Sequence, residues 1–232
     1  MELTIIRILV LVFSVVVHEY AHGWAAWRLG DNTARDSGRL TLNPLPHLDP
    51  VGSILVPLVL SFTNSIMLGW AKPVPVMVGK LNNPRDDHPK VAAAGPASNL
   101  LIALVAAILL GLMLRFGGGM TAIAQAQGAG EPSLHVFLFQ LLRTAIFINV
   151  VLAMFNLLPL PPLDGSWILI RFLSPAAQAS YLQLHRYGMF LVIGFLLLIR
   201  YTPFGGVVES GLMGVVRPFF ELSLSIAGLG AG

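Results

Sequence analysis

Long apolar runs separated by short polar stretches are the feature that most constrains the fold of this chain. The clearest runs cover residues 4–28, 91–114, 134–158 and 181–199. An apolar helix of about 20 residues is long enough to cross the hydrocarbon core of a bilayer. Only 11% of the 232 residues are charged, whereas soluble domains carry roughly 25%. We therefore expect an all-α polytopic membrane protein with about four to six transmembrane helices.

The chain is interpreted as a single membrane-embedded domain over residues 1–232. Every motif described below lies within residues 4–173, and residues 174–232 are expected to add C-terminal helices. The last stretch, residues 205–232, is apolar but interrupted by charged residues, so its pattern assigns no element.

The region between the first two long runs predicts short elements of other kinds. Residues 39–42 alternate between polar and apolar side chains, which indicates a short β-strand. Residues 51–68 are apolar but short and contain Pro57, which favours a re-entrant segment covered by protein. Residues 69–76 include two prolines spaced by one residue, which favour an extended edge strand over a helix.

The composition excludes two kinds of site. The formal net charge is +3, but the Lys and Arg residues lie in loops between apolar runs, as the positive-inside rule expects of a membrane protein. We therefore reject a nucleic-acid-binding function. The chain contains no cysteine, so any bound metal must be held by His, Asp or Glu.

The first apolar run continues into the motif His18-Glu19-Tyr20-Ala21-His22. Residues four apart lie on one face of a helix, so both imidazoles can bind one metal ion while Glu19 lies near its bound water. The alternative is a set of polar side chains satisfied inside a helix bundle. Ionisable residues within a membrane helix are costly and are functional candidates by default. The motif therefore predicts a zinc site with His18 and His22 as ligands.

A catalytic zinc needs a third protein ligand and an open position. Asp164 is the best-placed carboxylate, because it ends the stretch Asn156-Leu-Leu-Pro-Leu-Pro-Pro-Leu-Asp164-Gly165 just after a long apolar run. The prolines end that helix and stiffen the chain, so the carboxylate is held at a fixed depth. The alternative interpretation of Asp164 is a helix-capping residue before Gly165.

Together these two motifs resemble the site-2 protease family of intramembrane zinc metalloproteases. The similarity covers about residues 10–165 and points to the compact bacterial branch, without the PDZ or CBS domains that some members carry. The resemblance implies that His18, His22 and Asp164 bind a Zn²⁺ cofactor. It further implies that the chain hydrolyses peptide bonds within or beside the bilayer, with transmembrane proteins as substrates.

The resemblance also assigns other residues. Glu19 resembles the family's catalytic base, and Asn156 resembles the asparagine that steadies the substrate or the oxyanion. Gly95 to Asn99 resembles the family's GxxxN element, and we assign Asn99 to substrate binding. The edge strand expected over residues 69–76 could hold an unwound substrate by strand addition. Its candidate substrate-binding residues are Trp70, Ala71, Lys72, Pro73 and Val74.

Two other functions stay open at this point. A metal-ion transporter could use the same three ligands as a transit site, although it would need no general base. A non-catalytic relative could bind membrane segments without cutting them, although such a protein would be expected to have lost ligands. Nothing in the sequence sets the oligomeric state.

The family arrangement also makes a demand on topology. His18 and Asp164 each lie toward or beyond the C-terminal end of a long helix, so these helices must run in the same direction. Residues 51–68 should then make no net crossing, and the basic residues share one side. By the positive-inside rule that side is cytoplasmic, so the active site of a multi-pass protein in a bacterial-type cell membrane opens toward the cytoplasm. The basic residues are Arg28, Arg35, Arg39, Lys72, Lys80, Arg85 and Lys90.

Overall fold

The computed structural model describes residues 2–49, 72–121, 123 and 133–229, and the regular elements of these residues are all helices. The long helices are α1 (Glu2–Arg28), α4 (Pro84–Phe116), α6 (Leu134–Asn156) and α10 (Phe204–Ala227). Shorter α-helices are α2 (Thr33–Asp36), α7 (Asp164–Ile170), α8 (Pro175–Leu184) and α9 (Gly188–Tyr201). The 3₁₀ turns are η1 (Leu45–His47), η3 (Val78–Lys80) and η4 (His185–Tyr187). The predicted all-α class is confirmed.

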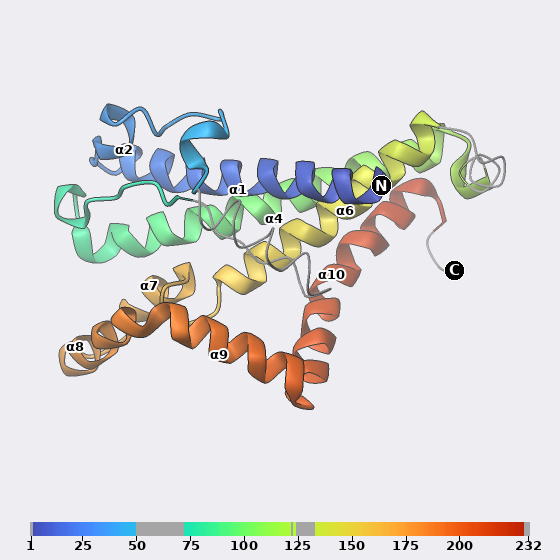
Figure 1. Ribbon diagram of the computed structural model, residues 1–232. Coiled ribbons are helices and arrows are strands. Elements are labelled where there is room, and N and C mark those ends of the chain that lie inside the picture. Colours follow the sequence, from blue (N-terminus) through green and yellow to red (C-terminus); the bar gives the residue numbers. More distant parts are fainter. Residues whose placement is uncertain (1, 50–71, 122, 124–132, 230–232) are drawn as a thin grey trace.

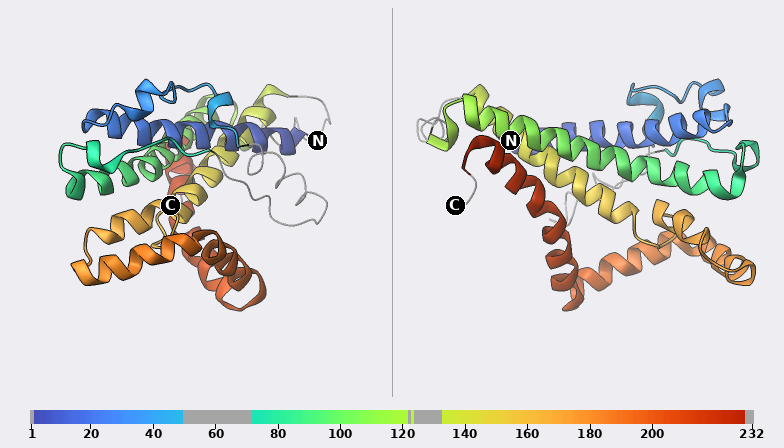
Figure 2. Two further views of the ribbon diagram at one scale, coloured as in Figure 1. Left: turned by 60° about the vertical axis from the view of Figure 1, so that its left-hand side comes forward. Right: turned by 180° about the vertical axis from the view of Figure 1, so that it is seen from behind.

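Helix α4 lies at the centre of the molecule and packs along α1, α6 and α10. Helices α1 and α6 run in the same direction and α4 runs in the opposite one (Figures 1 and 2). Ala103 and Ala107 of α4 are fully buried at 0% exposure. Small side chains of this kind let helices approach closely inside a membrane, where packing replaces the hydrophobic effect as the driving force.

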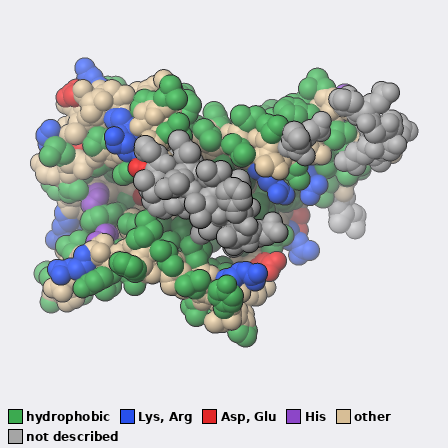
Figure 3. All heavy atoms as spheres, in the orientation of Figure 1, with side chains coloured by type: hydrophobic (Ala, Val, Ile, Leu, Met, Phe, Trp, Pro, Cys, Tyr) green, Lys and Arg blue, Asp and Glu red, His purple; other side chains and the backbone are tan. Residues whose placement is uncertain are grey.

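Among the residues that the structure describes, four stretches are long and apolar enough to cross a membrane, judged by length and composition: Leu3–Arg28, Pro84–Phe116, Leu134–Asn156 and Pro175–Tyr201. Large apolar side chains lie exposed along them, and Phe190 is 74% exposed. Figure 3 shows apolar side chains spread along the helices, with Lys and Arg side chains at the end that holds α2 and in several smaller groups elsewhere on this face. Lipid solvates such a surface, whereas a soluble monomer rarely exposes one. A polytopic membrane protein is therefore the correct class.

The helix predicted over residues 181–199 is not continuous. The 3₁₀ turn η4 separates α8 from α9. At this point Gly188 packs against the proline stretch that follows α6, and a Cβ on Gly188 would lie 3.0 Å from the ring of Pro162. The chain thus bends where it meets these prolines. Hydropathy alone does not report this contact.

The sequence assigned no element to residues 205–232, and residues 205–227 of this stretch form nearly all of α10. Val216 and Ser223 of α10 are buried, and Ser223 lies against Gly111 of α4, where a Cβ would be 2.7 Å from its carbonyl oxygen. The charged residues lie on the outer face, where Arg217 and Glu221 form an ion pair at 3.5 Å. The helix ends at Gly228, which adopts a left-handed conformation with φ of 75°.

The β-strand predicted over residues 39–42 is wrong, because these residues form turns. The backbone N–H of Arg39 donates to the carbonyl oxygen of Ala34 at 2.9 Å. The N–H of Asn43 donates to the side-chain oxygen of Thr41 at 3.1 Å. These local hydrogen bonds take the place of a strand ladder, as Ser, Thr and Asn side chains often do.

The segment Lys72–Met77 is also not part of a sheet, because its backbone donors bind side chains and a loop carbonyl in place of a neighbouring strand. The N–H of Val74 donates to Glu19 Oε2 at 2.8 Å, and the N–H of Met77 donates to Asp31 Oδ2 at 2.6 Å. The segment is therefore fastened to α1 and to the turn that follows it. The re-entrant segment predicted over residues 51–68, together with Trp70 and Ala71, lies outside the described residues and stays a prediction.

Asp31 is the main anchor of this arrangement. Its side chain is fully buried at 0% exposure and accepts hydrogen bonds from the N–H and hydroxyl of Thr33 as well as from Met77. Burial alone raises the pKa of Asp31, but the bonds from Thr33 and Met77 outweigh this and lower the pKa below its ordinary value of 3.8. A carboxyl group with a lowered folded-state pKa stabilises the fold above its unfolded pKa, and this contribution is lost as pH falls through the folded pKa.

We predict that Asp31→Asn lowers the free energy of unfolding by about 1.5–3 kcal/mol at pH 7, because a charged acceptor is lost at a buried site. Thermal unfolding of the purified, metal-free protein in detergent measures the effect. The difference from wild type should shrink below a pH of about 4. The exposed Asp36→Asn is the matched control. An Asp31→Asn protein as stable as the control at pH 7 would contradict the anchor role.

Candidate metal centre

Three side chains converge toward the C-terminal half of α1, at the start of α7. His18 Nε2 lies 3.2 Å from Asp164 Oδ2, and His22 Nε2 lies 3.3 Å from Asp164 Oδ1. The two Nε2 atoms are 3.0 Å apart. The His-x-x-x-His spacing brings both rings to one face of α1, with their planes at 84°. The structure thus brings together the three ligands that the sequence proposed, two from α1 and one from the start of α7, the short helix that follows α6.

The far side of each imidazole ring is held by α4. His22 Nδ1 lies 2.8 Å from the carbonyl oxygen of Val91. A carbonyl oxygen only accepts, so this nitrogen carries the proton and Nε2 of His22 presents its lone pair to the site. His18 Nδ1 lies 2.6 Å from Asn99 Oδ1. Partners of this kind fix the ring orientation of metal-binding histidines.

Gly95 makes room for both rings where α4 passes them. A Cβ at this position would lie 2.6 Å from His18 Nε2 and would also overlap His22 Nε2. No other residue fits there without moving a histidine. The GxxxN element therefore has a physical basis, because Gly95 clears the space and Asn99, one turn later, holds His18.

Asp164 is positioned by the chain that follows α6. The next residue, Gly165, is buried, and a Cβ on it would overlap the carbonyl group of Leu157 at the end of α6. The start of α7 therefore lies directly on the last turn of α6. At the other end of α7, Arg171 pairs with Asp86 of α4 at 2.7 Å. Both contacts restrict where the Asp164 carboxylate can lie.

The cluster has the properties of a cation site. All three ligand atoms lie within 4.8 Å of one another, and the spacing of 3.0–3.3 Å between nearest atoms is close to the roughly 3.3 Å between two ligands of a tetrahedral zinc. Asp164 Oδ2 is buried without a hydrogen-bond partner. Crowding of acceptor atoms at this spacing is unfavourable unless a positive charge lies between them. The residues present therefore fit a zinc ion.

Glu19 lies beside the cluster and is held by the segment Lys72–Met77. Its Oε2 accepts the N–H of Val74 at 2.8 Å. The Val74 side chain is buried against Gly23, one turn after Glu19 on α1, where a Cβ would lie 3.0 Å from Val74 Cγ1. Small size at Gly23 thus allows the segment to approach α1 and reach the Glu19 carboxylate.

The structure places Asn99 and Asn156 in surroundings that the sequence did not predict. Asn99 is fully buried at 0% exposure, and both ends of its carboxamide are bonded inside the bundle. We therefore correct its assignment from substrate binding to orientation of His18. Asn156 is half-buried in the last turn of α6, where its Nδ2 donates to the carbonyl oxygen of Leu152 at 2.9 Å.

The substrate-binding prediction for Lys72, Pro73 and Val74 is constrained by their backbone bonds. The N–H of Lys72 donates to the carbonyl oxygen of His47, and that of Val74 to Glu19. Proline has no N–H to offer. Within Lys72–Met77, Val76 has the one backbone N–H that donates to no other described residue. A full strand ladder with a substrate is therefore not available along this segment.

Sequence reasoning missed Asn149 and Ser14. Both side chains are fully buried at 0% exposure and are connected to His18 through Asn99. The signal that could have found Asn149 is its position: a carboxamide within an apolar membrane helix, seven residues before Asn156 and so on the same face.

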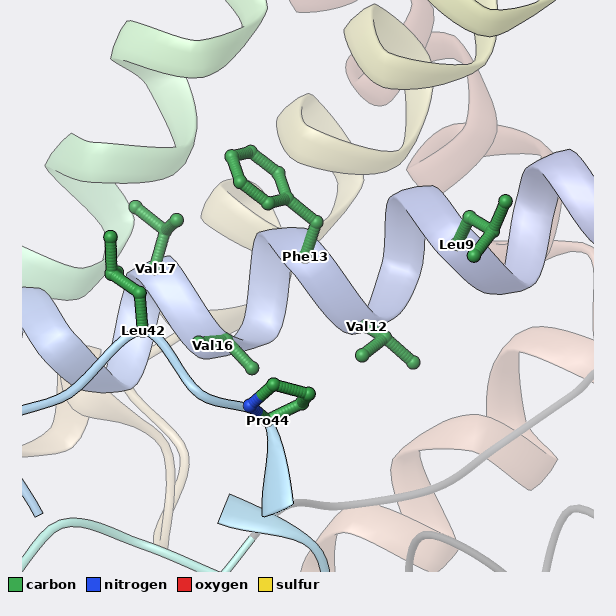
Figure 4. A pocket seen from close by; sticks show the side chains of 7 residues that line it. All are labelled: Leu9, Val12, Phe13, Val16, Val17, Leu42 and Pro44. Carbon is green, nitrogen blue, oxygen red and sulfur yellow. The ribbon is translucent and has the colours of Figure 1, made fainter. Parts of the chain in front are cut away.

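An apolar pocket of about 230 Å³ lies along α1, beside residues that precede His18 in the sequence. Figure 4 shows the side chains of α1 and of the following loop that line it. The pocket contains no ligating side chain, so it is a surface for apolar contacts. Its lining residues are Leu9, Val12, Phe13, Val16, Val17, Leu42 and Pro44.

Comparison with known proteins places this geometry in a family. The model of peptidase family M50 matches residues 112–201, which include Asn156 and Asp164. A Bacillus subtilis protein, "Putative zinc metalloprotease YwhC", is 41% identical over 201 residues, which are 87% of this chain and 82% of that protein. The chain belongs to peptidase family M50. This confirms the resemblance to the site-2 proteases.

More distant relatives of this M50 protein occur in mycobacteria. "Putative zinc metalloprotease Rip2" of Mycolicibacterium smegmatis is 29% identical over 210 residues, covering 90% of this chain and 71% of the relative. Rip2 of Mycobacterium tuberculosis is 28% identical over the same length. No solved structure matches the chain.

We predict that Gly95→Ala abolishes stoichiometric zinc binding, because the added methyl group overlaps both histidine rings. Metal analysis of the purified protein measures this, with circular dichroism to report helix content. Gly211→Ala is the matched control, since a Cβ there meets no atom within 4 Å. If the Gly95→Ala protein retained one zinc per chain, the space that Gly95 leaves for the two histidine rings would not be needed for zinc binding.

Proposed function

We propose that this M50 member is a zinc-dependent endopeptidase that cuts transmembrane or membrane-proximal segments of other proteins. The observation that carries the proposal is the meeting of His18, His22 and Asp164 beside Glu19, in a chain whose helices α1, α4 and α6 are long and apolar enough to cross a membrane. Two imidazoles and one carboxylate leave a fourth position open, as catalytic zinc sites require. The names of the relatives agree with zinc as the metal.

The residues of this chain divide the reaction between them. Zinc, when bound, would supply a Lewis acid that polarises the scissile carbonyl and lowers the pKa of water. Glu19 would take the proton from the attacking water and pass it to the leaving amine. The Val74 N–H holds Oε2 of Glu19, which leaves Oε1 for these proton transfers.

Asn156 is proposed to donate a hydrogen bond to the oxyanion that develops on the scissile carbonyl. Its position in the last turn of α6, eight residues before Asp164, supports this role. One of its Nδ2 hydrogens is bound to Leu152. The second hydrogen is available for a substrate atom.

The substrate must present an extended peptide, because a helix buries its carbonyl groups in its own hydrogen bonds. We propose that Lys72, Pro73 and Val74 flank the scissile bond together with Trp70 and Ala71. The Val76 N–H is the one backbone donor of Lys72–Met77 that bonds no other described residue. The substrate would therefore contact this segment through carbonyl groups and side chains more than through a strand ladder.

We further propose that the active site opens to the cytoplasm and that the N-terminus lies outside. The support is the distribution of charge: the end where α1 stops and α4 begins carries seven of the 14 Lys and Arg residues, from Arg28 to Lys90, and residues 117–133 carry none. A metal transporter is the weaker alternative, because Glu19 is held in place beside the metal ligands and a transit site needs no such base.

We predict that Glu19→Gln retains zinc but lowers cleavage of a model transmembrane peptide by about 10²–10⁴-fold, the usual contribution of a general base. The measurement pairs metal analysis with gel-based cleavage by the purified protein in detergent. Glu209→Gln, an exposed glutamate of α10, serves as the control. Undiminished cleavage by Glu19→Gln would refute the assigned base, and zinc-free wild type would refute the proposed function.

We also predict that Val74→Pro lowers kcat by about 10–100-fold with little change in KM, because the N–H that orients Glu19 is lost. Val74→Ala is the control, since it trims the side chain but keeps the N–H. Steady-state kinetics on the same peptide distinguish orientation of Glu19, which affects kcat, from substrate binding, which affects KM. A raised KM with unchanged kcat would assign Val74 to substrate binding instead.

A further inference from the structure

A chain of hydrogen bonds leads from His18 through α4 and α6 back to α1. His18 Nδ1 lies 2.6 Å from Asn99 Oδ1, and Asn99 Nδ2 donates to Asn149 Oδ1 at 2.8 Å. Asn149 Nδ2 donates to Ser14 Oγ at 2.8 Å and to the carbonyl oxygen of Ala145 at 2.9 Å. Ser14, Asn99 and Asn149 are all at 0% exposure. Three buried polar side chains on three helices therefore meet behind one imidazole.

The direction of every bond in this chain follows from its far end. The Ala145 carbonyl oxygen can only accept, so the carboxamide atom facing it must be Nδ2 of Asn149. Oδ1 of Asn149 then faces Asn99, so the Asn99 atom it meets must be the donor Nδ2. This turns Oδ1 of Asn99 toward His18. An oxygen of this kind accepts, so His18 Nδ1 must carry the proton.

We propose that Asn149, supported by Ser14, is a positioning residue that orients the Asn99 carboxamide and thereby keeps His18 in the Nδ1–H tautomer. Nε2 of His18 then presents its lone pair to Asp164 and to any bound cation. Without Asn149, the longer bond from Asn99 Nδ2 to the Ser14 carbonyl oxygen, at 3.4 Å, alone opposes a 180° turn of the Asn99 side chain. After such a turn Asn99 would donate to Nδ1, which would place the proton of the neutral ring on Nε2. The inference rests on the proposed metal site and requires no substrate.

A purely structural role for Asn149 makes a different prediction. Polar side chains often join membrane helices without any effect on chemistry. Asn156 provides the comparison, because it lies on the same helix and donates to the carbonyl oxygen four residues earlier, as Asn149 does. Asn149, however, also accepts from Asn99. The two asparagines therefore share a backbone contact and differ in their connection to His18.

The test compares zinc affinity in Asn149→Leu and Asn156→Leu, using purified full-length protein in detergent and a competing chelator. We expect Asn149→Leu to weaken zinc binding by about 10-fold, at the low end of the 10–100-fold typical for partners of metal ligands. Asn156→Leu should bind zinc as wild type does. In an Asn99→Ala background, Asn149→Leu should cause no further loss, since it acts through Asn99.

Nuclear magnetic resonance of ¹⁵N-histidine-labelled, metal-free protein reads the tautomer directly. His18 in wild type should be protonated at Nδ1, whereas Asn149→Leu should show a mixture of both neutral tautomers. Wild-type zinc affinity together with a wild-type tautomer in Asn149→Leu would overturn the proposal.

A second pair of variants tests the role of Asn149 if the Asn149→Leu protein is not natively folded, as the loss of a cooperative unfolding transition would show. Ser14→Ala removes one acceptor from Asn149 and should weaken zinc binding, though less than Asn149→Leu. Ser223→Ala removes a buried hydroxyl from α10 and should leave zinc affinity unchanged; equal affinities in the two variants would contradict the proposal. Failure of wild type to bind zinc would instead refute the proposed function, and the tautomer measurement would still test Asn149.

Discussion

The structure depends on one electrostatic constraint: two imidazole nitrogens and a carboxylate are held within hydrogen-bond distance of one another, inside a membrane domain. Electron-rich atoms gathered in this way are stable only around a positive charge. Every close approach around the site serves this convergence. Gly95 admits both rings, Gly165 sets Asp164 on the end of α6, and Gly23 lets Val74 reach Glu19.

The same constraint explains the order of the helices. The HExxH motif lies toward the end of α1, and Asp164 follows the end of α6, so these helices must be parallel and α4 must return between them. Central α4 then holds both histidines from behind, through the Val91 carbonyl group and Asn99. His18, Asn99, Asn149 and Ser14 thus form a continuous hydrogen-bonded support and are not isolated buried groups.

Much of this site could be predicted from the sequence because its geometry is local. His18 and His22 share a helix face by spacing alone, and apolar length defines α1, α4 and α6. Asp164 is distant in sequence, yet the prolines before it indicated a fixed position. The role of Asn99 was missed because buried orientation of a histidine depends on which helices pack together, and no local pattern reports that.

Local turns and a tertiary contact explain the other errors. Residues 39–42 form local turns in place of the predicted strand. The break between α8 and α9 follows from the contact of Gly188 with Pro162. The central claim, that His18, His22 and Asp164 bind one zinc ion, is tested most directly by X-ray absorption at the zinc edge of the purified protein. We predict one zinc per chain with two imidazole ligands, and a first shell that loses an oxygen ligand in Asp164→Ala. Absence of stoichiometric zinc, or a spectrum unchanged by Asp164→Ala, would contradict the account.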